Sequence, residues 1–101
     1  MAWQLCLDSS EDRTGSEFKP GTPFALKLEG SLTTTIKLQC KRWQEKPDPD
    51  DVPEWSAGEQ LPSQEILPCY AIQDTLYRVV ANGGGLKVYW NVAMTSQADR
   101  K

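Results

Sequence analysis

The residues that most often carry protein chemistry are few in this chain and lie far apart. There is no histidine, and the three cysteines, Cys6, Cys40 and Cys69, form no CxxC pair. A serine or cysteine nucleophile normally needs an activating base, which is usually histidine. A structural zinc site needs four ligands, mostly cysteine and histidine in close pairs. The sequence therefore predicts no catalytic triad, no metal site and no cofactor.

The densest group of carboxylates is Asp48, Asp50 and Asp51, within a proline-rich stretch. Two carboxylates can hydrolyse a glycosidic bond, and a cluster of them can hold calcium. A catalytic pair needs rigid support, and the calcium loop of EF-hands has a spacing that this stretch lacks. The group is typical of a solvated loop, so we predict that the protein is not an enzyme.

The cysteines have two interpretations. Reduced, buried thiols behave as small apolar side chains. One disulfide with a spare thiol is the alternative, which the spacing leaves open. Cys40 follows Ile36 and Leu38 on one face of an expected strand, so we predict that its thiol is reduced and buried.

Charge and hydropathy exclude several partners. The 101 residues include eleven lysines and arginines against fourteen acidic residues, a net charge of −3. Binding to nucleic acid or to an anionic membrane surface depends on clustered basic residues, which are absent. The uncharged residues 1–7 are too short to span a bilayer, and the basic and apolar regions of a signal peptide are missing. We therefore expect synthesis in a cytoplasm.

Alternation of apolar with polar residues predicts short β-strands along most of the chain. Six or seven short strands joined by turns predict an all-β fold, a small antiparallel β-sandwich or barrel. We expect one domain over residues 1–94 and a polar tail over residues 95–101. The expected strands are residues 3–8, 24–29, 33–41, 66–71, 75–81 and 86–92, with Pro68 marking an edge strand.

The same alternation predicts which side chains face the core. Trp3, Leu5 and Leu7 are expected on one face of the first strand. The strands of residues 24–29 and 33–41 flank a glycine-containing turn, so we predict a hairpin. The residues that we expect to be buried are Leu26, Ile36, Leu38, Val88 and Trp90.

Residues 44–63 contain four of the seven prolines and no alternation, which predicts one long loop. Trp43 precedes this loop and Trp55 lies within it. Exposed aromatic residues anchor protein interfaces or stack on sugars, whereas capping of the core is the structural alternative for Trp55. Our candidate interface consists of Trp43, Val52, Trp55 and Leu61.

Three short segments carry a family resemblance. They are GSLTTTIKLQ (residues 30–39), LYRV (residues 76–79) before a glycine-rich turn, and LKVYW (residues 86–90), with a Trp-bearing loop between the first two. In this order they resemble the small β-sandwich structural proteins of tailed bacteriophages. The pattern departs from that family at Gln39-Cys40-Lys41 and in its longer loop. The resemblance implies a virion component, such as a capsid decoration protein, head fibre or tail-associated module, without catalytic residues.

We therefore expect a non-enzymatic structural component of a phage-like virion. It would bind capsid or tail proteins as a decoration or connector subunit in many copies, since repeated docking strengthens weak contacts. The alternative is a carbohydrate- or host-receptor-binding module that uses Trp43, Trp55 and Tyr70. A glycan site would place such aromatic residues around one concave surface.

Overall fold

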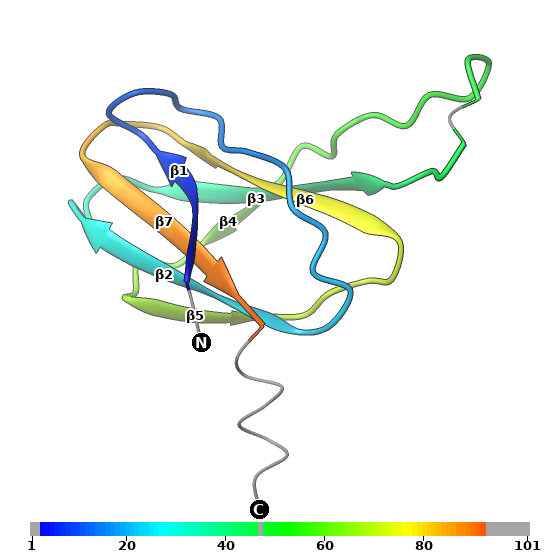
Figure 1. Cartoon of the computed structure of the whole chain (residues 1–101). Helices are drawn as coiled ribbons and strands as arrows, with labels where there is room; N and C mark the ends of the chain where they lie inside the picture. Colours follow the sequence, from blue (N-terminus) through cyan, green and yellow to red (C-terminus); the bar gives the residue numbers. More distant parts are fainter. Residues whose placement is uncertain (1–2, 47, 93–101) are drawn as a thin grey trace, which may run out of the picture.

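Two antiparallel β-sheets pack face to face in the computed structural model of this chain (Figure 1). The structure describes residues 3–46 and 48–92, which form seven strands and no helix. The predicted small all-β sandwich is confirmed, and the predicted tail, residues 95–101, lies outside the described residues. The strands are β1 (Gln4–Asp8), β2 (Phe24–Gly30), β3 (Ile36–Arg42), β4 (Glu59–Leu61), β5 (Ile66–Cys69), β6 (Thr75–Ala81) and β7 (Leu86–Asn91).

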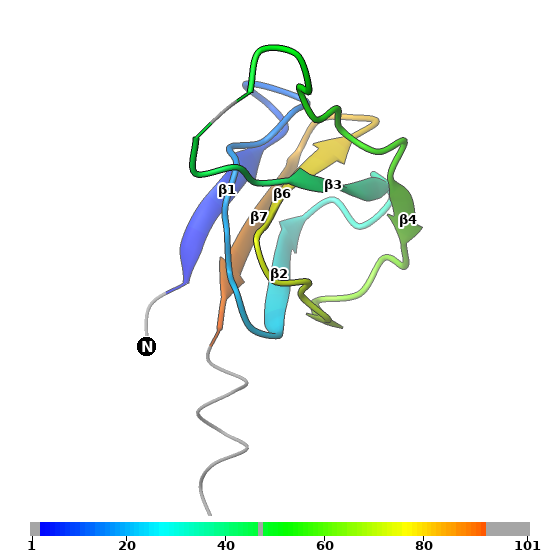
Figure 2. The same cartoon turned by 90° about the vertical axis from the view of Figure 1, so that its right-hand side faces the viewer.

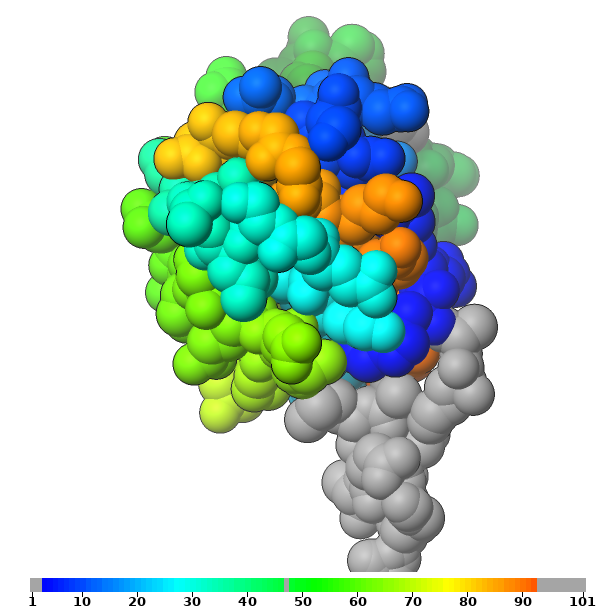
Figure 3. Space-filling model, turned by 90° about the vertical axis from the view of Figure 1, so that its left-hand side faces the viewer, coloured from blue at the N-terminus to red at the C-terminus, as the bar shows by residue number. Residues whose placement is uncertain are grey.

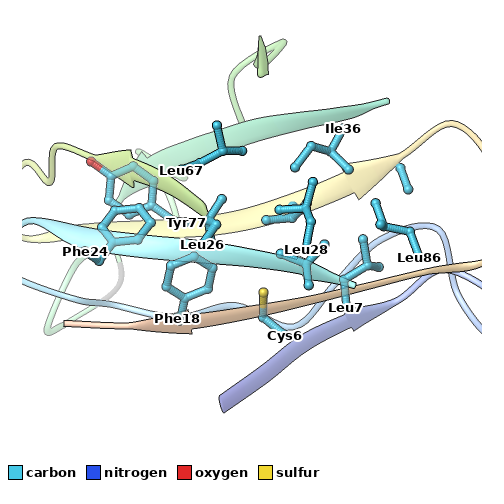
Figure 4. Packing of buried hydrophobic residues seen from close by; sticks show 13 residues of the cluster. Cys6, Leu7, Phe18, Phe24, Leu26, Leu28, Ile36, Leu67, Tyr77 and Leu86 are labelled. Carbon is cyan, nitrogen blue, oxygen red and sulfur yellow. The ribbon is translucent and has the colours of Figure 1, made fainter. Parts of the chain in front are cut away.

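The core lies between the two sheets, where alternate residues of each strand point inward. On β6 every second residue is buried, as a half-buried strand requires. Side chains from both sheets and from one loop fill the interior (Figure 4). The buried apolar cluster consists of Cys6, Leu7, Phe18, Phe24, Leu26, Leu28, Ile36, Leu67, Tyr77, Val79, Ala81, Leu86 and Val88.

Three of the five predicted core residues are buried, namely Leu26, Ile36 and Val88. Leu38 and Trp90 are half-buried and pack against the core, so their predicted full burial is wrong. Leu38 lines a hollow at the side of the sandwich, where no second layer covers it completely.

The first strand departs from simple alternation at a β-bulge between Leu5 and Leu7. Cys6 and Leu7 are both buried, whereas Leu5 is 52% exposed. A bulge adds one residue to one strand of a pair, so residues on its two sides no longer alternate regularly. The prediction that Leu5 and Leu7 share a face is therefore wrong: Leu7 enters the core and Leu5 faces outward.

The chain changes sheet between strands that were expected to pair. Sheet A has the order β1-β7-β2-β5, and sheet B has the order β4-β3-β6. The predicted hairpin is wrong, because β2 pairs with β7 and β5 whereas β3 pairs with β4 and β6. The connection between β2 and β3 crosses from one sheet to the other, as does the glycine-rich turn between β6 and β7.

The two crossing turns, residues 31–35 and 82–85, are hydrogen-bonded to each other. The N–H of Ser31 and the hydroxyl of Thr34 each donate to a carbonyl oxygen of the second turn, both at 2.9 Å. Gly30 has a φ of 114°, and a Cβ there would overlap another part of that turn. The glycine that favoured a hairpin therefore allows the two turns to approach each other.

One side of the sandwich, between β1 and β6, is closed by residues 13–18, which we call the strap (Figure 2). Phe18 and Tyr77 exchange two backbone hydrogen bonds of 2.9 and 2.8 Å, which tie the strap to β6. The N–H of Ser16 donates to the carbonyl of Cys6 on β1 at 2.8 Å. The Phe18 side chain is 6% exposed and enters the core.

The opposite side lies between the edge strands β4 and β5, and the described residues provide no second strap there. β5 is the edge strand that Pro68 predicted. β4 lies inside the stretch of residues 44–63, so the prediction of loop throughout that stretch is wrong. It pairs with β3 over only three residues, too few for an alternating pattern to be recognised.

Candidate functional site

Residues 44–46 and 48–58 project from the sandwich, and we call them the arm (Figure 1). Trp43 and Val52 line one hollow of about 360 Å³ at the base of the arm. Trp43 directly follows β3, and its N–H donates to the carbonyl of Asp74 at 2.8 Å. The Lys19 ammonium lies 3.5 Å from the centre of its ring. The indole is therefore half-buried under a cation, whereas Val52 is 68% exposed.

Trp55 folds back onto the outer face of sheet B. The Arg78 guanidinium lies 4.3 Å and the Lys41 ammonium 4.9 Å from the centre of its ring. Arg78 also donates to Gln39 Oε1 at 2.7 Å, which holds the guanidinium in place. Next to Trp55, the N–H of Ser56 donates to a carbonyl of β3 at 2.9 Å. Trp55 thus anchors the arm on sheet B and does not cap the core.

The acidic end of the arm is exposed. Arg42 and Asp51 form an ion pair of 2.9 Å on the surface, and the N–H of Asp50 donates to the Asp48 carboxylate at 2.9 Å. Within the described part of the chain, no three cysteines or carboxylates gather closely enough to hold a metal ion. The arm therefore carries three carboxylates close in the chain to the exposed Val52, one of them paired with Arg42.

Leu61 and Tyr70 belong to a second hollow, of about 570 Å³, on the open side of the sandwich between β4 and β5. Tyr70 is 91% exposed at the rim, and Ile72 beside it is 65% exposed. Of the residues that the structure describes, Glu59 is the one charged residue of the lining. The hollow is lined by Leu38, Cys40, Ser56, Gly58, Glu59, Leu61, Pro68, Cys69, Tyr70, Ile72 and Tyr77.

All three cysteines are free thiols. Burial raises the pKa of Cys6 from 9.0 to about 12. Burial and then the negative charge of Glu59 raise the pKa of Cys69 to about 11. Cys40 is half-buried, because it lines the open hollow, so its predicted burial is wrong. A thiol needs a depressed pKa to serve as a nucleophile at neutral pH, and Cys6 and Cys69 have the opposite shift.

The three aromatic residues proposed for a glycan site are not gathered around one hollow. Trp43 lines the hollow at the arm, Tyr70 lines the hollow between β4 and β5, and Trp55 lies against Arg78 and Lys41. No protein-family model, curated protein or solved structure matches this chain. No helix among the described residues is long and apolar enough to cross a membrane.

A further surface lies on the outer face of sheet A, where cross-strand pairing aligns one residue from each strand. Leu5 pairs with Tyr89, Tyr89 with Lys27, and Lys27 with Ile66. We call these four residues the outer row. Directly paired residues of an antiparallel sheet share a face, and Figure 3 shows β1, β7, β2 and β5 side by side on this side of the molecule.

The outer row is largely apolar although it faces away from the core. Leu5 is 52% and Ile66 46% exposed, and Tyr89 is half-buried. The Lys27 ammonium lies 6.0 Å from the Tyr89 ring centre and 5.9 Å from that of Trp3. Lys27 also pairs with Glu29 at 3.3 Å, so the row carries a charged pair within an apolar surface.

Sequence reasoning missed the outer row. Tyr89 stands between Val88 and Trp90, so its outward direction was readable from alternation. The outward direction of Leu5 depends on the bulge, and its alignment with Ile66 depends on which strands pair. Both are long-range features that a single sequence does not display.

Proposed function

We propose that the protein is a non-enzymatic structural component of a phage-like virion, docked in many copies onto capsid or tail proteins through the outer face of sheet A. The observation that carries this proposal is the outer row. Antiparallel strands with one solvated face normally alternate apolar residues inside with polar residues outside. Here Leu5 and Ile66 instead present apolar side chains to solvent.

The chemistry of the outer row suits a protein neighbour. Exposed apolar side chains beside polar groups are typical of protein interfaces, and aromatic residues are enriched at the centres of such interfaces. Leu5, Tyr89 and Ile66 supply the apolar part, and the pair of Lys27 with Glu29 supplies polar groups. The expected partner surface is a flat apolar area with hydrogen-bonding groups for this pair.

The arm supplies a second contact in this proposal. Val52 is exposed among the carboxylates of Asp48, Asp50 and Asp51. Such a surface would favour a basic area on a neighbour and disfavour contact between two copies of the same arm. With one contact at sheet A and another at the arm, the subunit could connect two neighbours.

The assignment to a virion is supported by the resemblance of residues 30–92 to small phage structural proteins. The proposed role of decoration subunit follows from it, as do the virion location and synthesis in a host cytoplasm, whereas the role of connector rests on the two contacts. A small binding subunit gains from repetition, because many weak contacts on one lattice act together.

The experiment compares incorporation of variants into particles purified from cells that produce the protein. Leu5→Ser and Ile66→Ser each remove an exposed apolar side chain from the outer row. We expect each to lower the number of retained copies by about tenfold, the effect of roughly 1.4 kcal/mol at the interface. Val52→Ser tests the second contact, on the arm, and its loss should be smaller.

Incorporation of both outer-row variants at the wild-type level would contradict docking through sheet A. A large loss with Val52→Ser alone would assign docking to the arm instead. If the wild-type protein were absent from particles and bound a defined glycan, the carbohydrate-binding alternative would replace the virion role.

A further inference from the structure

The two sides of the sandwich differ in how completely the core residues are covered. Between β1 and β6 the strap covers the gap and Phe18 is buried. Between β4 and β5 the inner-face residues remain half-buried around the hollow of about 570 Å³. These incompletely covered core residues are Leu38, Cys40, Leu61 and Cys69.

The closed side shows what kind of segment covers the core of this sandwich. The strap is an extended segment that bonds to the edge of β6 and inserts one aromatic ring, Phe18, between the sheets. That ring lies edge-on to Phe24, with centroids 5.4 Å apart. A second extended segment with one large apolar side chain could cover the open side in the same manner.

The open side also presents backbone groups for such a segment. The N–H of Ser56 donates to the carbonyl of Cys40, so the backbone groups of Cys40 point toward β4. Backbone groups alternate along a strand, so those of Leu38 and Ile36 point the same way. Leu38 pairs with Glu59, and Ile36 pairs with Leu61. The backbone N–H and C=O groups of Glu59 and Leu61 therefore point back toward β3. The N–H and C=O of the residue between them, Gln60, therefore point to the free edge.

The edge of β5 is a poorer acceptor of a new strand. The N–H of Leu28 donates to the carbonyl of Glu65, so the backbone groups of Glu65 and Leu67 point toward β2. The backbone groups of Ile66 and Pro68 consequently point to the free edge, and Pro68 has no N–H to donate. An added segment is therefore expected along β4, with β5 forming the other wall of the hollow.

The charge of the hollow indicates which charge the incoming segment should carry. Glu59 is the charged residue of the lining, and no lysine or arginine of the described residues lines the hollow. The same carboxylate contributes to the raised pKa of Cys69, which places its charge near the thiol within the hollow. A lysine or arginine on the incoming segment would complement this carboxylate.

We infer that the open side binds an extended peptide segment of a partner protein. The segment adds along β4, inserts an aromatic or large aliphatic side chain between Leu61 and Cys69, and places a basic side chain against Glu59. Tyr70 and Ile72 at the rim then cover the inserted side chain. This inference takes from the proposed function only the source of the segment, a neighbouring subunit, and its chemistry is independent of docking through sheet A.

The test uses the full chain, labelled with nitrogen-15, and two short synthetic peptides. Each peptide is rich in threonine and carries one phenylalanine, with a lysine two positions away so that both point to one face. In the second peptide, glutamate replaces the lysine. We expect amide shifts at residues 58–61 and 69–72, and binding of the lysine peptide about tenfold tighter than that of the glutamate peptide.

Two variants of the chain complete the test. Glu59→Gln should remove most of the preference for lysine, whereas Glu54→Gln, an exposed carboxylate on the arm, should leave it unchanged. Shifts confined to other surfaces, equal affinity for the two peptides, or no binding of either would each overturn the inference. None of these results would affect the particle experiment with Leu5→Ser and Ile66→Ser.

Discussion

Ile36 combines two roles, because it is 2% exposed in the core and begins the strand that carries β4. Replacing it by alanine removes apolar contacts and leaves a cavity. We expect Ile36→Ala to lower the free energy of unfolding by about 2–5 kcal/mol in a urea titration. Ile72→Ala is the control, since Ile72 is 65% exposed and surface substitutions stay within about 0.5 kcal/mol. Equal midpoints for the two variants would remove Ile36 from the core.

The thiol of Cys6 gives a prediction about pH. Its pKa is about 12 in the folded chain against 9.0 ordinarily. Above pH 9 the unfolded chain therefore releases a proton that the folded chain keeps, which favours unfolding. Stability from this group is complete below pH 9 and declines as pH rises from 9 toward 12, by at most about 1.4 kcal/mol per pH unit.

Unfolding titrations at pH 8 and pH 10 would measure this effect by comparing the wild type with Cys6→Ala. The variant should lose less stability between the two pH values. The same burial predicts the order of labelling by a thiol reagent at pH 8: Cys40, which is half-buried in the open hollow, before Cys6. Labelling of Cys6 first would contradict the placement of this side chain in the core.

At the scale of the elements, the strap depends on a glycine. A Cβ at Gly15 would overlap the backbone of Cys6, so the strap passes β1 at a distance that only glycine allows. We expect Gly15→Ala to lower the free energy of unfolding by about 1–3 kcal/mol. It should also speed hydrogen exchange at the amide of Phe18, which bonds to β6.

The matched control is Gly84→Ala. The nearest atoms to a Cβ at Gly84 lie at 3.6 Å, an ordinary contact, and its φ is not in the left-handed region. This variant should unfold within about 0.5 kcal/mol of the wild type. If Gly15→Ala were equally well tolerated, the close passage of the strap along β1 would be refuted.

The positions of every strand except the three-residue β4 were predictable from the sequence, but strand partners were not. Alternation reports which side chains share a face, and it placed Leu26, Ile36 and Val88 correctly. It does not report which sheet a strand joins, so a glycine turn that crosses between sheets was read as a hairpin. The bulge at Cys6 was missed for a related reason, since its extra residue is defined only by the pairing with β7.

At the scale of the whole molecule, the candidate residues are distributed over separate surfaces. The sequence identified Trp43 and Trp55 as unusual, but not the cations that cover them, because Lys19 and Arg78 come from distant segments. The outer row and the open hollow arise from the arrangement of the sheets. The aromatic residues were thus recognisable by type, whereas the surfaces available to a partner depend on the fold.

The net charge of −3 adds an expectation about the isolated subunit. Its acidic arm should oppose self-association, so the purified protein should sediment as a monomer and assemble only on a partner. Analytical ultracentrifugation at low and high salt measures this. A stable dimer at low salt would contradict this expectation.

The most direct measurement of the proposed virion role is the number of copies of this chain per purified particle. Quantitative mass spectrometry against the major shell protein gives that number, after density-gradient purification and a salt wash. We predict a constant ratio that corresponds to many copies per particle and survives the wash. Absence of the chain from particles, or a ratio that varies between preparations and falls to zero on washing, would contradict a structural role.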